Sequence, residues 1–228
     1  MLRTGFIATL ALAAGTASAS TTVLNQQTDI VAPSFRGDAN TTYLGWDVFD
    51  EVTIQNNIPV ITDLNPDLGT AGGSFITNNG ADHQSSSFNY YSGGSSVDET
   101  ITFDAATGPG GFTTVIVQGI TLFGALGAPI QFSEINGFAP VVNEQIPFPD
   151  GNAAGKGSFF VKYEIPGSIA ASSSFDIDGG SFTSFDKFTV DTQWSATGFA
   201  PDTALVPEPG SIALLGLGGL LALRRRRA

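Results

Sequence analysis

Apolar residues recur at every second position in two segments of the chain, and this period constrains the fold more than any other feature. In residues 159–165 the side chains of Phe159 and Val161 fall on one face and that of Lys162 on the other. Residues 188–194 repeat the pattern, with Phe188 opposite Thr189. Because successive side chains of a β-strand point to opposite faces, both segments are predicted to be half-buried strands.

Turn-forming residues divide the rest of the chain into short segments. The sequence contains 28 glycines and 12 prolines beside 18 phenylalanines, a composition typical of many short strands joined by turns. Residues 112–123 are almost continuously β-branched or aromatic and predict a central strand or two. Residues 78–96 are rich in serine, glycine and asparagine and predict a loop. Further strands are predicted at residues 43–49, 52–54, 74–77, 97–103 and 138–142.

The spacing of these segments predicts the architecture. Roughly eight to eleven strands over this length indicate an all-β domain built as a two-sheet β-sandwich with jelly-roll-like topology. We expect this domain to be flanked by an N-terminal signal helix and a short C-terminal apolar helix.

The N-terminus has the three-part order of a secretory signal. Arg3 precedes an uncharged apolar run at residues 5–15, and small residues follow at Ala17 and Ala19. This order predicts cleavage after Ala19 and export through the general secretion machinery.

The C-terminus combines an extended acidic motif, an apolar run and a basic cluster. A helix over residues 210–223 would reach about 21 Å, against about 30 Å for the hydrocarbon core of a bilayer. Basic side chains beyond it can reach the lipid headgroups, so the helix is predicted to contact the membrane before processing. The motif and the basic cluster consist of Val206, Pro207, Glu208, Pro209, Arg224, Arg225, Arg226 and Arg227.

These C-terminal residues resemble the PEP-CTERM sorting signal. That resemblance implies recognition by exosortase, a membrane-embedded transpeptidase-like enzyme, removal of the tail near the motif, and delivery to the cell surface or an exopolysaccharide matrix. A Gram-positive sortase signal would need Leu-Pro-x-Thr-Gly, which is absent. A plain tail anchor is the remaining alternative. The chain is therefore divided into a signal peptide at residues 1–19, a β-sandwich domain at 20–205 and a sorting signal at 206–228.

The charge of the middle domain limits its partners. Residues 20–205 contain four basic side chains against 20 acidic ones, so nucleic acid is not an expected partner. The chain has no cysteine, which leaves no disulfides, thiol catalysis or thiolate metal sites. Its one histidine, His83, lies in a polar segment, and no Gly-x-Ser-x-Gly motif accompanies it. No catalytic residue and no organic cofactor are therefore predicted.

Calcium is the one cofactor for which the sequence offers ligands. Asp176 and Asp178 are followed by two glycines, and Asp186 lies eight residues after Asp178. Carboxylate and backbone carbonyl oxygens are the ligands that calcium prefers. The spacing departs from an EF-hand, and as members of one strand Asp176 and Asp178 would simply face solvent together.

Other side chains are candidates for sugar chemistry. Glycoside hydrolysis needs two carboxyl groups at a suitable distance from each other. Because the domain has many acidic residues, the sequence does not identify such a pair, and the glutamates are the first candidates. Trp46 and Trp194 are predicted to lie mainly in the core, whereas Tyr90 and Tyr91 are expected to be exposed. The glutamates are Glu51, Glu134, Glu144 and Glu164.

We therefore expect an exported protein of the cell envelope, cell surface or extracellular matrix that is not an enzyme and that associates with extracellular polysaccharide or biofilm. The alternative is a secreted carbohydrate-binding or carbohydrate-active β-sandwich that depends on calcium.

Overall fold

The computed structural model describes ten segments of the chain. The predicted signal helix with its Ala17 and Ala19 cleavage site, and the predicted apolar helix and sorting signal, lie outside them. In the described segments no helix is long and apolar enough to cross a membrane. The segments are residues 30–49, 52–55, 58–61, 63–78, 83–84, 89–92, 96–123, 130–147, 157–181 and 183–201.

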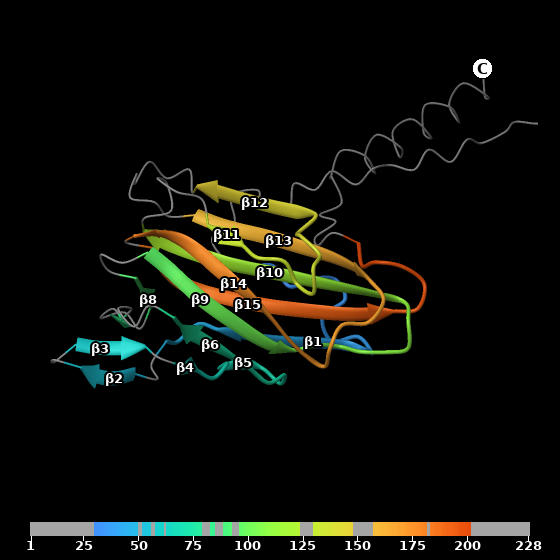
Figure 1. Ribbon diagram of the computed structural model, residues 1–228, viewed down its shortest axis with the longest axis horizontal. Coiled ribbons are helices and arrows are strands. Elements are labelled where there is room, and N and C mark those ends of the chain that lie inside the picture. The colour runs from blue at the N-terminus through green and yellow to red at the C-terminus, as the bar shows by residue number, and fades with distance from the viewer. Residues whose placement is uncertain are drawn as a thin grey trace, which may run out of the picture.

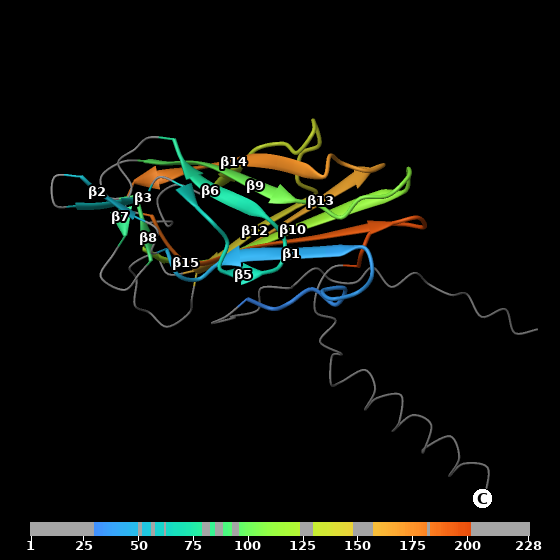
Figure 2. The ribbon, with the colours of Figure 1, turned by 90° about the horizontal axis from the view of Figure 1, so that it is seen from below.

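Two antiparallel sheets form the domain, and Figure 2 shows them stacked as two layers. The described residues contain no helix, so the predicted all-β, two-sheet class is confirmed, while the jelly-roll topology stays a prediction. The large sheet has the order β12 (Val142–Pro147), β13 (Gly157–Pro166), β10 (Phe112–Phe123), β15 (Ser184–Ser195), β8 (Tyr90–Tyr91), β7 (His83–Gln84), β3 (Ile58–Ile61) and β2 (Val52–Gln55), with β1 (Thr41–Trp46) beside β15 and β5 (Leu68–Gly69) beside β1. The small sheet has the order β11 (Gln131–Phe132), β14 (Ser172–Ser181), β9 (Ser96–Asp104), β6 (Gly73–Thr77) and β4 (Asp63–Leu64).

Long strands dominate the large sheet. Residues 112–123 form the single strand β10, which pairs with β13 on one side and β15 on the other (Figure 1). Its continuous β-branched sequence fits this central position, where both faces are buried. The strands predicted at residues 159–165 and 188–194 are likewise present, within β13 and β15.

Aromatic side chains fill the space between the sheets. The ring of Phe75 from the small sheet lies 5.7 Å from Trp46 and 5.8 Å from Phe188, both of the large sheet, in edge-to-face geometry. Phe103 and Phe175 extend the cluster along the small sheet. Burial of these rings is the main source of stability in a chain that has no disulfides.

The segments that precede β1 and follow β15 cover the outer face of the large sheet. In Figure 2 the blue segment before β1 lies beneath that sheet, on the side away from the small sheet. Phe35 from this segment and Ala200 from the segment after β15 pack against Ile116 and Phe160. The prediction of half-buried strands was therefore wrong for this face: Lys162 is 4% exposed and Asp191 is fully buried.

Two local predictions also need correction. Residues 138–141 are not a strand, because Ile135 and Phe138 close a tight turn in which Asn136 and Gly137 have φ of 52° and 82°, and β12 begins at Val142. The predicted loop at residues 78–96 contains the short strands β7 and β8.

Candidate functional site

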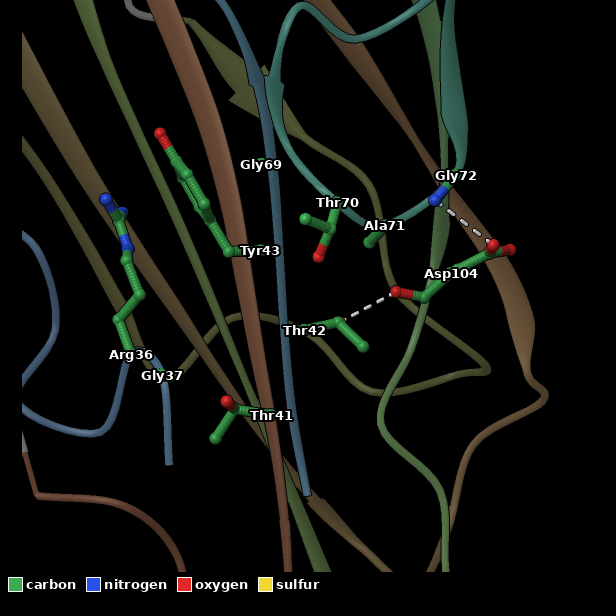
Figure 3. Close-up of a pocket in the computed structure, with 10 residues that line it drawn as sticks. All are labelled: Arg36, Gly37, Thr41, Thr42, Tyr43, Gly69, Thr70, Ala71, Gly72 and Asp104. Atoms are coloured by element: carbon green, nitrogen blue, oxygen red, sulfur yellow. Dashed lines mark hydrogen bonds between the residues drawn. The ribbon is translucent and has the colours of Figure 1, made fainter. Parts of the chain in front are cut away.

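A groove of about 410 Å³ lies at the junction of β1, the segment after β5 and the end of β9. Figure 3 shows its side chains on both sides of β1. Tyr43 and Thr41 lie on the side of Arg36, and Thr42 points toward Asp104. The groove is lined by Arg36, Gly37, Thr41, Thr42, Tyr43, Gly69, Thr70, Ala71, Gly72 and Asp104.

Glycines allow the segment after β5 to wrap closely around β1. The backbone N–H groups of Thr70 and Ala71 both donate to the carbonyl of Tyr43, at 3.2 and 3.3 Å. Gly69 has φ of +85°, and a Cβ there would overlap the Tyr43 carbonyl. Only glycine meets both demands, so residues 69–72 form a fixed wall of the groove.

Arg36 forms the opposite wall through two interactions. Its guanidinium donates to both carboxylate oxygens of Asp191 at 2.6 and 2.7 Å. Its Cζ lies 3.6 Å from the centroid of the Tyr43 ring, a cation–π contact. Burial raises the pKa of Asp191, and the guanidinium opposes that shift.

Thr42 connects the groove to the second sheet. Its Oγ1 donates to the Asp104 carbonyl at 2.8 Å and lies 2.6 Å from Thr192 Oγ1. The Asp104 carboxylate in turn accepts from the Gly72 N–H at 3.2 Å. The lining described here thus offers hydroxyls, one carboxylate and an aromatic ring, but no histidine or cysteine.

The predicted calcium ligands do not converge. Asp176 and Asp178 lie on the exposed face of β14, as expected for alternate strand positions, whereas Asp186 belongs to β15 in the other sheet. Asp98 of β9 lies directly opposite Asp178, a proximity that the sequence could not reveal. In the described part of the chain, no three acidic, histidine or cysteine side chains are grouped to hold a metal ion. Calcium binding stays a prediction.

The predicted aromatic residues separate into core and surface. Trp46 is fully buried and donates from Nε1 to the Leu64 carbonyl at 3.1 Å, which confirms its core position. The prediction that Tyr90 is exposed was wrong: it is fully buried, and its hydroxyl donates to the equally buried Glu99. Tyr91 is half-buried.

Trp194 lies at the surface end of β15 rather than in the core. Its side chain is half-buried, and Nε1 donates to the Gly110 carbonyl at 2.8 Å. A Cβ at Gly108 would overlap the indole, so the backbone there covers the ring. One side of this ring is therefore covered by the chain's own backbone.

The predicted glutamates occupy separate places. Glu134 follows β11, Glu144 lies on β12, and Glu164 on β13 pairs with Lys162 at 2.7 Å. Glu144 lies directly opposite Phe160 of β13. Since Glu164 follows Phe160 by four residues, the two glutamates are about 13 Å apart along the strand direction. Glu51 lies outside the described residues, as does the side chain of His83.

A carboxyl pair that sequence reasoning missed joins Asp47 and Asp67. The Asp67 carboxylate accepts from the backbone N–H groups of Asp47 and Val48, at 3.1 and 2.8 Å. Partial desolvation of this otherwise exposed residue and the adjacent Asp47 carboxyl raise the pKa of Asp67 to about 6. Twenty residues separate the two acids, so no local spacing pointed to them.

The comparisons with known proteins match the C-terminal end of the chain. Residues 205–227 match the model of the PEP-CTERM protein-sorting motif. The chain contains a PEP-CTERM sorting signal. This confirms the resemblance carried by Pro207, Glu208, Pro209 and the arginine cluster, and it implies exosortase processing and export to the cell envelope or surface. No curated protein and no solved structure matches the chain.

Proposed function

We propose that this PEP-CTERM protein is a non-enzymatic component of the cell surface or exopolysaccharide matrix, displayed as an intact β-sandwich after exosortase removes its tail. The observation that supports this most directly is the position of the sorting motif. It begins at residue 205, just beyond Ala200, where the chain is still fixed to the large sheet.

Ala200 is held by contacts that do not involve the tail. Its N–H donates to Thr114 Oγ1 at 2.9 Å, and its carbonyl accepts from Lys162 Nζ at 2.9 Å. The ring of Phe199 packs on Phe112 at 5.0 Å. A cut at the motif therefore leaves in place all the strands that the structure describes.

The fixed end also limits the tether. From Pro201 to Pro209 a fully extended chain spans at most about 28 Å, so a protein attached at the motif stays close to its attachment point. The domain has only four basic residues and therefore carries a strong negative charge. This charge keeps it soluble and repels it from anionic surfaces.

Intact mass spectrometry on protein from the producing organism tests this proposal. We expect the wild-type protein to lack residues 1–19 and the residues after the motif, and to be recovered outside the inner membrane. A Pro207→Ala, Glu208→Ala double variant should retain the tail in the membrane fraction, whereas a Glu134→Ala variant in the domain should be processed normally. Wild-type protein isolated with Leu220 still attached would contradict the proposal.

The groove favours a second candidate function, binding of extracellular carbohydrate. Its volume of about 410 Å³ lies within the usual range of ligand sites, and its lining includes the ring of Tyr43 and the hydroxyls of Thr41 and Thr70. Calorimetric titration with the organism's own polysaccharide should give binding that a Thr70→Val variant weakens and a Tyr91→Phe variant leaves unchanged. Equal affinity of both variants would exclude the groove. A thermal melting temperature that calcium at millimolar concentration does not raise would exclude calcium support.

A further inference from the structure

One asparagine of the chain lies in an acceptor sequence for N-linked sugars. Asn40 is followed by Thr41 and Thr42, and no other asparagine has serine or threonine two residues later. Asn-x-Ser/Thr is the acceptor pattern of N-glycosylation when it lies on an exposed loop of an exported protein. We propose that Asn40 is modified with an N-linked oligosaccharide during export, an inference that rests on export of the chain but not on its surface role.

The turn before β1 presents Asn40 to solvent. Its side chain is exposed, and its backbone has φ of 61°, the left-handed conformation of a tight turn. The Asn40 carbonyl accepts from the Trp194 N–H at 3.0 Å, which fixes the main chain at this point. A Cβ at the neighbouring Gly37 would meet no atom within 4 Å, so the turn projects into open space that can hold a sugar.

The hydroxyl of the acceptor threonine is free of its folded-state partners only before folding. In the folded domain Thr42 Oγ1 is engaged by the Asp104 carbonyl and by Thr192. Thr192 lies 150 residues later in the chain, and β15, to which it belongs, pairs with β1. During translocation the segment around Asn40 therefore emerges long before its partner strand, which leaves the hydroxyl free for a transferase to bind.

The modification is a substitution at the first carbon of the sugar. A polyprenyl-diphosphate-linked oligosaccharide is the donor. The amide nitrogen of Asn40 forms a bond to C1 while the bond from C1 to the diphosphate oxygen breaks, the amide loses one proton to a base, and the lipid diphosphate leaves. No electron transfer is involved. Folding then places the sugar beside Thr41, at the rim of the groove.

Backbone geometry offers a competing reason for an asparagine at this position, because asparagine favours the left-handed region. Asn136 provides the matched control. It has φ of 52° and is also exposed, but Phe138 stands where an acceptor needs a hydroxyl. Aspartate retains the turn preference of asparagine and removes the amide nitrogen, so Asn→Asp substitutions at both positions separate the two explanations.

The test is peptide mass mapping of full-length protein isolated from the producing organism. We expect the peptide that contains Asn40 to exceed its polypeptide mass, with fragmentation placing the added sugar on Asn40. The excess should vanish in Asn40→Asp and Thr42→Val, persist in Thr42→Ser, and be unaffected by Asn136→Asp.

An Asn40 peptide found only at its unmodified mass overturns the proposal, and so does a sugar located on Thr41 or Thr42. The surface role is tested separately, by the mass of the C-terminal end of the mature protein. A tail that is retained with Asn40 modified contradicts exosortase processing alone, whereas a processed tail with Asn40 unmodified contradicts the glycosylation alone.

Discussion

The carboxylate of Asp191 is held by the guanidinium of Arg36, a residue 155 positions earlier in the chain, through hydrogen bonds of 2.6 and 2.7 Å. The two side chains differ in exposure, since Asp191 is fully buried and Arg36 is 21% exposed. This pair fastens the segment before β1 across the outer face of the large sheet.

Arg36→Ala is expected to lower the free energy of unfolding by about 3–5 kcal/mol, because it leaves a buried carboxylate without its cation. Asp191→Asn should cost less, since the remaining arginine can turn toward water. Urea unfolding of both variants measures the difference. A larger loss for Asp191→Asn would show that the pair is not organised around the buried carboxylate.

Tyr90→Phe removes a hydroxyl that donates to Glu99 inside the sandwich. Loss of a hydrogen bond to a buried acceptor costs about 1–3 kcal/mol. Tyr91→Phe, at a half-buried neighbour, should change the free energy of unfolding by less than about 0.5 kcal/mol. Equal effects in chemical denaturation would contradict the inward orientation of Tyr90.

Acid stability should reflect the raised pKa of Asp67. Its pKa of about 6 in the folded state exceeds the ordinary value of 3.8, so the folded protein binds the proton more tightly than the unfolded chain. The stabilising contribution of this group is complete below pH 3.8 and is lost as the pH rises toward 6. Thermal melts from pH 3.5 to 7 should show a smaller decline in stability for Asp67→Asn than for the wild type. Parallel curves for the two proteins would count against a raised pKa.

Gly119 lies in the central strand β10, between Phe159 and Phe188 of the neighbouring strands. A Cβ there would overlap the Phe159 ring and lie 2.9 Å from the Lys187 carbonyl. Gly119→Ala should therefore destabilise the domain by about 1–3 kcal/mol through overpacking. Gly198→Ala is the control, because a Cβ at that position meets nothing within 4 Å. A neutral Gly119→Ala in thermal denaturation would mean that the strand can shift to make room.

The strand-forming segments could be predicted because their information is local. Alternation around Phe159 and Val161 and the β-branched run of β10 indicate strands whatever the rest of the chain does. Residues 138–141 were mistaken for a strand because apolar composition alone does not reveal the turn at Asn136 and Gly137, whose left-handed backbone reverses the chain.

The candidate site was not predictable in the same way. Arg36, Tyr43, Thr70 and Asp104 are scattered over almost 70 residues and share no motif. They meet because β1 inserts beside β15 and the segment after β5 wraps around it. The prediction that Tyr90 is exposed was wrong for a related reason. Its glycine- and serine-rich neighbours are typical of an exposed loop, but β8 pairs with β15 and places the ring in the core.

The sequence by itself revealed the sorting signal of this protein and its all-β class, because both depend on residues that are close together in the chain. Only the tertiary structure decided which polar side chains are buried. The alternation of β13 and β15 predicted a solvated face for Lys162 and Asp191, yet the two terminal segments fold over that face and supply Ala200 and Arg36 as partners. Burial of a charge depends on which distant segment covers it, and that is a property of the whole fold.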